Sequence, residues 1–137
     1  MLETGNRIYF FILMFQGEKM QNTVRITEGD TKYEVADTNS GTIAAAASQT
    51  FLSGALDKAA NSQHGSFNYL ELVNDSSEEI LVDLDGLSIR RRKLFQKSVL
   101  VIKPSENIFF NNVKITNNDS SNTIAANEIQ IIGRIVR

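Results

Sequence analysis

Residues 70–86, Leu-Glu-Leu-Val-Asn-Asp-Ser-Ser-Glu-Glu-Ile-Leu-Val-Asp-Leu-Asp-Gly, decide the fold class of this chain. Two alternating apolar runs flank the polar spacer at 74–77, and the second run ends at Asp85-Gly86. Asn, Asp and Gly tolerate the left-handed backbone of turns, and a period of two is typical of a half-buried strand. The stretch therefore predicts two strands, 67–73 and 79–84, joined by a turn.

The same pattern continues to the end of the chain. Further β-branched runs occupy residues 98–102, 108–115 and 128–136, and Asn111-Asn112 interrupts the second of them. Short strands at this spacing are typical of a sandwich or a small barrel. We therefore expect a mainly β protein, an antiparallel β-sandwich of the jelly-roll or immunoglobulin-like type. The run 98–102 is apolar on both faces, which predicts a central or covered strand.

The N-terminal half shows two other patterns. Alternating runs at 23–27 and 31–35 surround a turn containing Gly29, which predicts a hairpin. The period then changes to four, with an apolar stripe formed by Ile43, Ala47, Phe51, Ala55 and Ala59. A stripe at this spacing, with a run of alanines inside it, predicts one helix around residues 42–60.

Composition bounds the class of protein. The chain has 137 residues, which fits one domain, and its 42% hydrophobic and 22% charged residues are ordinary globular values. It has no cysteine, which excludes disulfides, thiolate zinc sites and cysteine nucleophiles. A net charge of −2 gives no general attraction to nucleic acid or to an anionic membrane. We expect no cofactor, no membrane partner and no nucleic-acid partner.

The first residues have an organisation of their own. Residues 8–15 are apolar but too few to span a bilayer, which takes about 20. The following Gln-Gly-Glu-Lys-Met at 16–20 can be encoded by bases that contain a bacterial ribosome-binding sequence before a start codon. We therefore expect residues 1–19 to be a translated leader or an N-terminal arm, and residues 20–137 to form a single β-rich domain starting at Met20.

Candidate catalytic residues are sparse. His64 is the only histidine and no nucleophile-elbow motif accompanies it, which favours an exposed loop residue. Asp83 and Asp85 form part of a calcium-loop pattern, but arginines follow where further oxygen ligands are needed. A strand end followed by an Asp-Gly turn explains the pair better. We predict that the chain is not an enzyme.

One cluster of positive charge stands out, formed by Arg90, Arg91, Arg92 and Lys93. Such a cluster can neutralise phosphates, yet few aromatic residues are interleaved with it and the chain is acidic overall. The favoured alternatives are a solvated loop and a contact between subunits that uses the acidic side chains at 78, 79 and 83.

Surplus apolar surface predicts self-association. Ile132 and Val136, with Val99 and Val101, face away from the side of their strands that carries the other aliphatic residues. Either a second subunit or a second sheet of the same chain must cover them. We therefore take the four basic residues, Ile132 and Val136 as interface candidates and expect a homo-oligomer.

From residue 69 onward, the strand and turn at 70–86 are followed by Val-Leu-Val-Ile-Lys-Pro-Ser-Glu at 99–106 and by the final Ile-Gln-Ile-Ile-Gly at 129–133. This order of elements, which covers the C-terminal half, resembles small β-sandwich virion proteins of tailed bacteriophages. It implies a structural virion component, assembled in the host bacterial cytoplasm, that decorates the capsid or associates with the head or tail and binds itself and other virion proteins.

A binding module for carbohydrate or a cell surface is the alternative. In that case Tyr33, Tyr69 and loop asparagines would contact the ligand. The chain contains no tryptophan, although ring stacking supplies much of the binding in such modules. This composition favours the virion interpretation.

Overall fold

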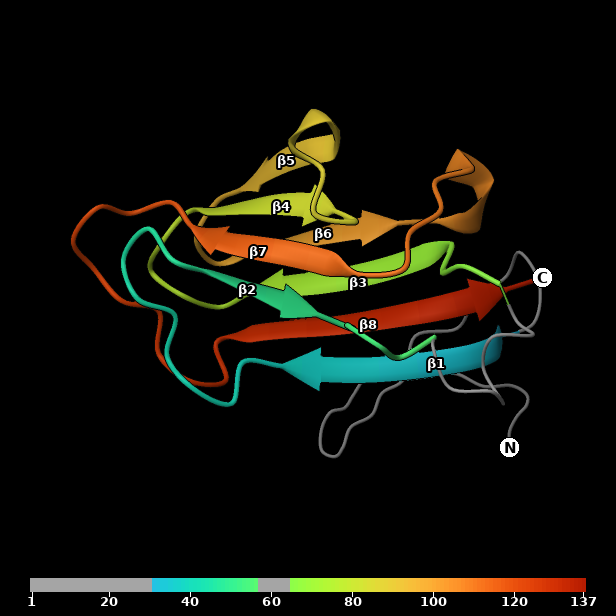
Figure 1. The fold of residues 1–137 in the computed structure, drawn as a ribbon, viewed down its shortest axis with the longest axis horizontal. Helices are drawn as coiled ribbons and strands as arrows, with labels where there is room; N and C mark the ends of the chain where they lie inside the picture. Colours follow the sequence, from blue (N-terminus) through green and yellow to red (C-terminus); the bar gives the residue numbers. More distant parts are fainter. Residues whose placement is uncertain (1–30, 57–64) are drawn as a thin grey trace. The chain divides into compact units, whose positions relative to one another are not determined.

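Strands in two antiparallel sheets make up the fold of the computed structural model, which describes residues 31–56 and 65–137 (Figure 1). One sheet has the order β1-β8-β3-β6 and the other β2-β7-β4-β5. The bounds are β1 Thr31–Thr38, β2 Ser48–Phe51, β3 Tyr69–Asn74, β4 Ile80–Leu84, β5 Arg91–Leu94, β6 Ser98–Ile102, β7 Val113–Asn117 and β8 Ile129–Val136. Two single-turn 3-10 helices, η1 Ser88–Arg90 and η2 Pro104–Glu106, lie before β5 and after β6.

The strand order is that of a jelly roll, which decides between the two expected types of sandwich. The strands pair in a nested order that forms one long antiparallel ribbon: β4 pairs with β5, β3 with β6, β2 with β7 and β1 with β8. The ribbon folds over on itself, and the new pairs β3–β8 and β4–β7 complete the two sheets. The turn between β4 and β5 is the innermost bend of this ribbon.

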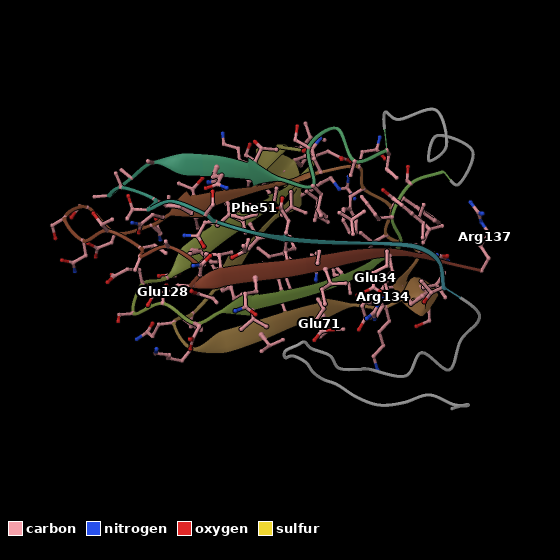
Figure 2. All side chains as sticks on the ribbon, turned by 90° about the horizontal axis from the view of Figure 1, so that it is seen from below. Glu34, Phe51, Glu71, Glu128, Arg134 and Arg137 are labelled. Carbon is pink, nitrogen blue, oxygen red and sulfur yellow. The ribbon has the colours of Figure 1, made fainter. Side chains whose placement is uncertain are left out.

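The core lies between the sheets, and its main faces agree with the sequence pattern. Leu70 and Leu72 of β3 are fully buried, as are the alternate residues Ile80 and Val82 of β4. The labelled Phe51 lies between the two sheets in Figure 2 and has no exposed surface. Alternation with a period of two puts one face of each strand into this core.

The helix expected around residues 42–60 is wrong over residues 42–56. Ile43 forms a bridge with Ile124, Ala47 belongs to a turn closed by an Ala47 N–H to Ala44 carbonyl bond, and β2 follows. Ile43, Ala47, Phe51 and Ala55 of the stripe still contact the core, but from extended and turn backbone, and Ala59 lies outside the described residues. Pairing with β7 satisfies the backbone and so overrides the helix propensity of the alanines.

Strand β6 has the expected bounds but not the expected position. It lies at the edge of its sheet rather than in the centre, and Val99 and Val101 are exposed. The two inner strands of this sheet are β8 and β3. Strand β5 occupies residues that the sequence analysis assigned to a basic loop, because Arg92 and Lys93 pair in register with Val82 and Leu81.

Asparagines that the sequence places in turns are partly structural. Asn39, Asn74 and Asn117 are fully buried, and each bonds the backbone of a neighbouring loop. Asn117, for example, donates to the carbonyls of Ile43, Ala44 and Asn122. Buried amides in these positions satisfy loop carbonyls that water cannot reach.

Several expectations fall on residues outside the described ranges. These are the leader or arm at 1–19, the start at Met20, the first hairpin strand at 23–27 and the loop residue His64. The second hairpin strand is present as β1, which pairs with β8. Thr31–Arg137 form one compact unit.

Candidate functional site

The basic cluster lies at the bend between β4 and β5. Strand β4 ends at Leu84, and Asp85 and Gly86 both have a positive φ, 56° and 72°. Asp and Gly are residues that adopt this left-handed backbone readily. The expected Asp-Gly turn is therefore present, and η1 and β5 follow it and carry the four basic residues.

Arg90 is held against the turn. Its Nη1 lies 2.8 Å from Asp85 Oδ2, and its Nη2 donates to the Phe109 carbonyl at 2.6 Å. The other carboxylate oxygen of Asp85 accepts the backbone N–H groups of Asn111 and Asn112. Asp85 therefore joins η1 to the segment before β7, and its oxygens are engaged by protein donors rather than arranged as a calcium loop.

Arg91 pairs with Asp83, its neighbour across the β4–β5 register. Its Nε and Nη2 donate to the two carboxylate oxygens at 2.8 and 3.0 Å. The Asp83 side chain is only 1% exposed, and these two hydrogen bonds from Arg91 compensate for the hydration that its carboxylate loses on burial. The bonds from Arg91 hold the pKa of the Asp83 carboxyl below its usual value. The sequence analysis considered Asp83 for a contact with another subunit, but its partner Arg91 lies in the same chain.

Arg92 and Lys93 are held less firmly. Lys93 Nζ lies 4.0 Å from Glu79 Oε2, and the lysine is exposed. Arg92 is half-buried, and no acidic or hydrogen-bonding partner lies within reach of it among residues 31–56 and 65–137. Within the described part of the chain its guanidinium donors are unpaired, and a guanidinium has five N–H donors that suit a carboxylate.

An open hollow beside these arginines has exposed apolar walls. Its volume is about 380 Å³, and its lining comes from η1, β5 and the chain before β7: Leu84, Ile89, Arg90, Arg91, Arg92, Asn107, Ile108 and Phe109. Ile89 is 91% exposed and Phe109 53%, with Leu87 exposed nearby. We call Leu87, Ile89, Arg90, Arg92 and Phe109 the arginine surface.

A second polar cluster lies on the outer face of the other sheet. Figure 2 shows Glu34 of β1 beside Arg134 of β8, with Glu71 of β3 nearby, and the register places Tyr69 of β3 opposite Arg134. Arg134 Nε donates to Glu34 Oε1 at 3.2 Å, and its guanidinium carbon lies 4.8 Å from the centre of the Tyr69 ring. Arg134 Nη1 is buried and has no hydrogen-bond partner in the described part of the chain.

Burial dominates the titration of this cluster. It raises the pKa of Tyr69 to about 12, and the nearby Glu71 carboxylate adds to the shift. Burial also raises the pKa of Glu71, while Arg134 acts in the opposite direction. In this cluster the Arg134 guanidinium lies near the carboxylates of Glu34 and Glu71 and over the Tyr69 ring, and its charge is balanced locally.

Ile132 and Val136 belong to this outer face. Both alternate with the core residues Ile131 and Ile135 along β8, as the sequence analysis expected. Ile132 is half-buried, whereas Val136 is only 3% exposed, and its backbone exchanges two bonds with the Asn68 side chain. Val136 therefore has the burial of a core residue, and Ile132 is the better surface candidate.

The described residues contain no group of three or more His, Asp or Glu side chains suited to a metal ion. Within the same ranges, no helix has the length and apolar character needed to cross a membrane. No protein-family model matches the chain, and neither a curated protein nor a solved structure shows significant similarity to it.

Proposed function

We propose that this chain is a structural component of a tailed-phage particle that works through protein–protein contacts. In this role it decorates the capsid or associates with the head or tail, binds itself and other virion proteins, and catalyses no reaction. It is assembled in the host bacterial cytoplasm and ends in the virion. The turn pattern after residue 69 supports the phage setting, and jelly rolls are among the folds of capsid proteins.

The observation that carries the protein-binding part is the arginine surface. Ile89 and Phe109 expose large apolar side chains beside Arg92, whose donors have no partner in the described ranges. Arginine and aromatic residues are enriched at protein interfaces, and arginine can bind a carboxylate with two donors at once. The surface fits an acidic, partly apolar patch on another virion protein.

The carbohydrate-binding alternative has no comparable support. The Tyr33 ring stacks on Phe67 with 6.2 Å between centres, and its hydroxyl donates to the Ala55 carbonyl. Tyr69 is only 5% exposed and lies under Arg134. Neither tyrosine presents an open ring for a sugar to stack on.

Mass spectrometry of purified phage particles from the chain's own host tests this proposal. We expect the wild-type chain in the particles at a fixed ratio to the capsid protein. The double substitution Ile89→Glu and Arg92→Glu should reduce incorporation by about tenfold or more, because it removes apolar contact and reverses a charge.

Thr123→Glu is the control for an added negative charge, since it places one glutamate on an exposed loop residue outside the arginine surface. Circular dichroism should show all variants folded. Particles that contain no more of the wild-type chain than of abundant host proteins would refute the proposed function.

A further inference from the structure

Strand β6 differs from the other edge strands of the two sheets. Natural edge strands are protected from pairing with other chains by charges, prolines, bulges or short length. Strand β1 carries Glu34 and Asp37 and has a bulge near its start, and β5 carries two arginines and a lysine. Strand β2 is four residues long and mostly polar. Strand β6, Ser-Val-Leu-Val-Ile, has none of the chemical protections.

The exposed face of β6 adds an apolar stripe to this open edge. Val99 is 56% exposed and Val101 39%, while Leu100 and Ile102 face the core between them. In the sheet, Val99 lies beside the half-buried Val73 of β3. The outward backbone groups of β6 pair with no other described strand, and an edge of this kind with a row of valines is suited to β-strand addition.

We propose that β6 pairs edge to edge with the β6 strand of a second copy of this chain, antiparallel and centred on Leu100. The strand is self-complementary about that residue, because a two-fold axis there places Val99 of each copy opposite Val101 of the other. Closed two-fold symmetry uses the same patch on both copies. The pairing joins two four-stranded sheets into one continuous sheet. This proposal rests on the proposed function, in which the chain binds to itself.

The sequence on either side of β6 gives the pairing a characteristic response to salt. In the same register Lys97 of one copy lies opposite Lys103 of the other; both lysines are exposed, and Lys97 Nζ lies 3.5 Å from the exposed Asp75 carboxylate of its own chain, which offsets only part of its charge. Like charges opposite each other across strands repel, and salt screens that repulsion. Association through β6 should therefore strengthen as ionic strength rises. A contact between the arginine surface and acidic side chains would weaken instead.

Cysteine pairs test the register directly, because the natural chain has no cysteine. We expect a mixture of Val99→Cys and Val101→Cys chains to form interchain disulfides with oxidised glutathione, since directly opposite residues lie within disulfide range. Either variant alone should crosslink no more than Thr123→Cys, the control on an exposed loop. Crosslinking of one variant with itself, or none in the mixture, would overturn the proposed register.

Sedimentation velocity of the full chain tests the interface itself. The wild type should dimerise in the micromolar to sub-millimolar range, more tightly at high salt, and the double variant Val99→Lys and Val101→Lys should be a folded monomer. Ile89→Lys, which adds one positive charge on the arginine surface, should still dimerise. A monomeric wild type, or a dimer that survives the double variant, would overturn the inference.

The two proposals fail separately. Particles that contain the chain, combined with no crosslinking of the mixture, would refute the β6 pairing and leave the virion role standing. Crosslinking in the expected pattern, with the chain missing from particles, would support the pairing and refute the virion role.

Discussion

Buried polar side chains do much to shape the loops at the residue scale. Asn39, Asn74 and Asn117 each stand at or just after the end of a strand and hold the next segment through side-chain bonds. Asp83 is also buried, but its compensation is the two-donor contact with Arg91. The polar positions that matter most to this fold are therefore ones that sequence patterns assign to the surface.

Replacing Asn117 with Ala should lower the free energy of unfolding by about 1–3 kcal/mol, because buried carbonyls lose their donors. Urea unfolding followed by circular dichroism measures the change. The neighbouring exposed Asn118→Ala should stay within about 0.5 kcal/mol of the wild type. Equal losses for the two variants would mean that burial of Asn117 contributes nothing specific.

At the scale of elements, local propensity and tertiary pairing disagree in one segment. Residues 44–47 are all alanine, which favours a helix, yet Ala46 has a φ of 59° and its N–H donates to the Asp119 carbonyl. The loop after β7 and β7 itself form hydrogen bonds with the backbone of this segment, in place of the bonds that a helix would form within itself. Pairing between distant residues therefore decides the structure of this element.

The substitution Ala46→Gly distinguishes the two structures by the sign of its effect. Left-handed backbone costs an L-residue about 1–2 kcal/mol, so glycine should leave the protein neutral to about 1 kcal/mol more stable. In a helix the same change would cost about 1 kcal/mol. Ala45→Gly, at a position without positive φ, should lose about 0.5–1 kcal/mol. Thermal unfolding of both variants measures these changes.

For the whole molecule, the fit between β8 and the segments that cover it depends on a residue without a side chain. Gly133 is buried on the core face of β8, and a Cβ atom there would lie 2.8 Å from Leu52 Cδ1 and 3.1 Å from Phe67 Cδ1. Phe67 in turn contacts the Tyr33 and Phe110 rings. The close approach is possible only because this position is glycine.

Gly133→Ala should therefore lower stability by about 1–3 kcal/mol through overpacking. Gly41→Ala is the control, because nothing lies within 4 Å of a Cβ built there and its φ is not positive. That variant should change stability by no more than about 1 kcal/mol in either direction. Differential scanning calorimetry measures both changes, and a Gly133→Ala protein as stable as the wild type would contradict the packing argument.

The apolar surplus seen in the sequence is resolved partly within the chain. Ile129, Ile131 and Ile135 of β8 pack into the core between the sheets, and Val136 is also buried. Among the described residues, the large apolar side chains that stay exposed are Val99 and Val101 on β6, those of the arginine surface, and Phe95 between β5 and β6. Self-association remains a prediction, and the structure favours β6 over β8 as the strand through which it would occur.

The sequence by itself determined the fold class, the core faces of four strands, and their bounds to within two residues: 67–73, 79–84, 98–102 and 128–136 were predicted, and β3, β4, β6 and β8 lie there. Alternation and turn residues are local signals, so they predict strands without any knowledge of which strands pair. Tertiary structure alone decided that β6 is an edge, that residues 48–51 and 91–94 are strands, and that Asp83 binds Arg91. Those features depend on pairing between distant residues, such as Phe51 with Val113, and no local pattern encodes which strand lies beside which.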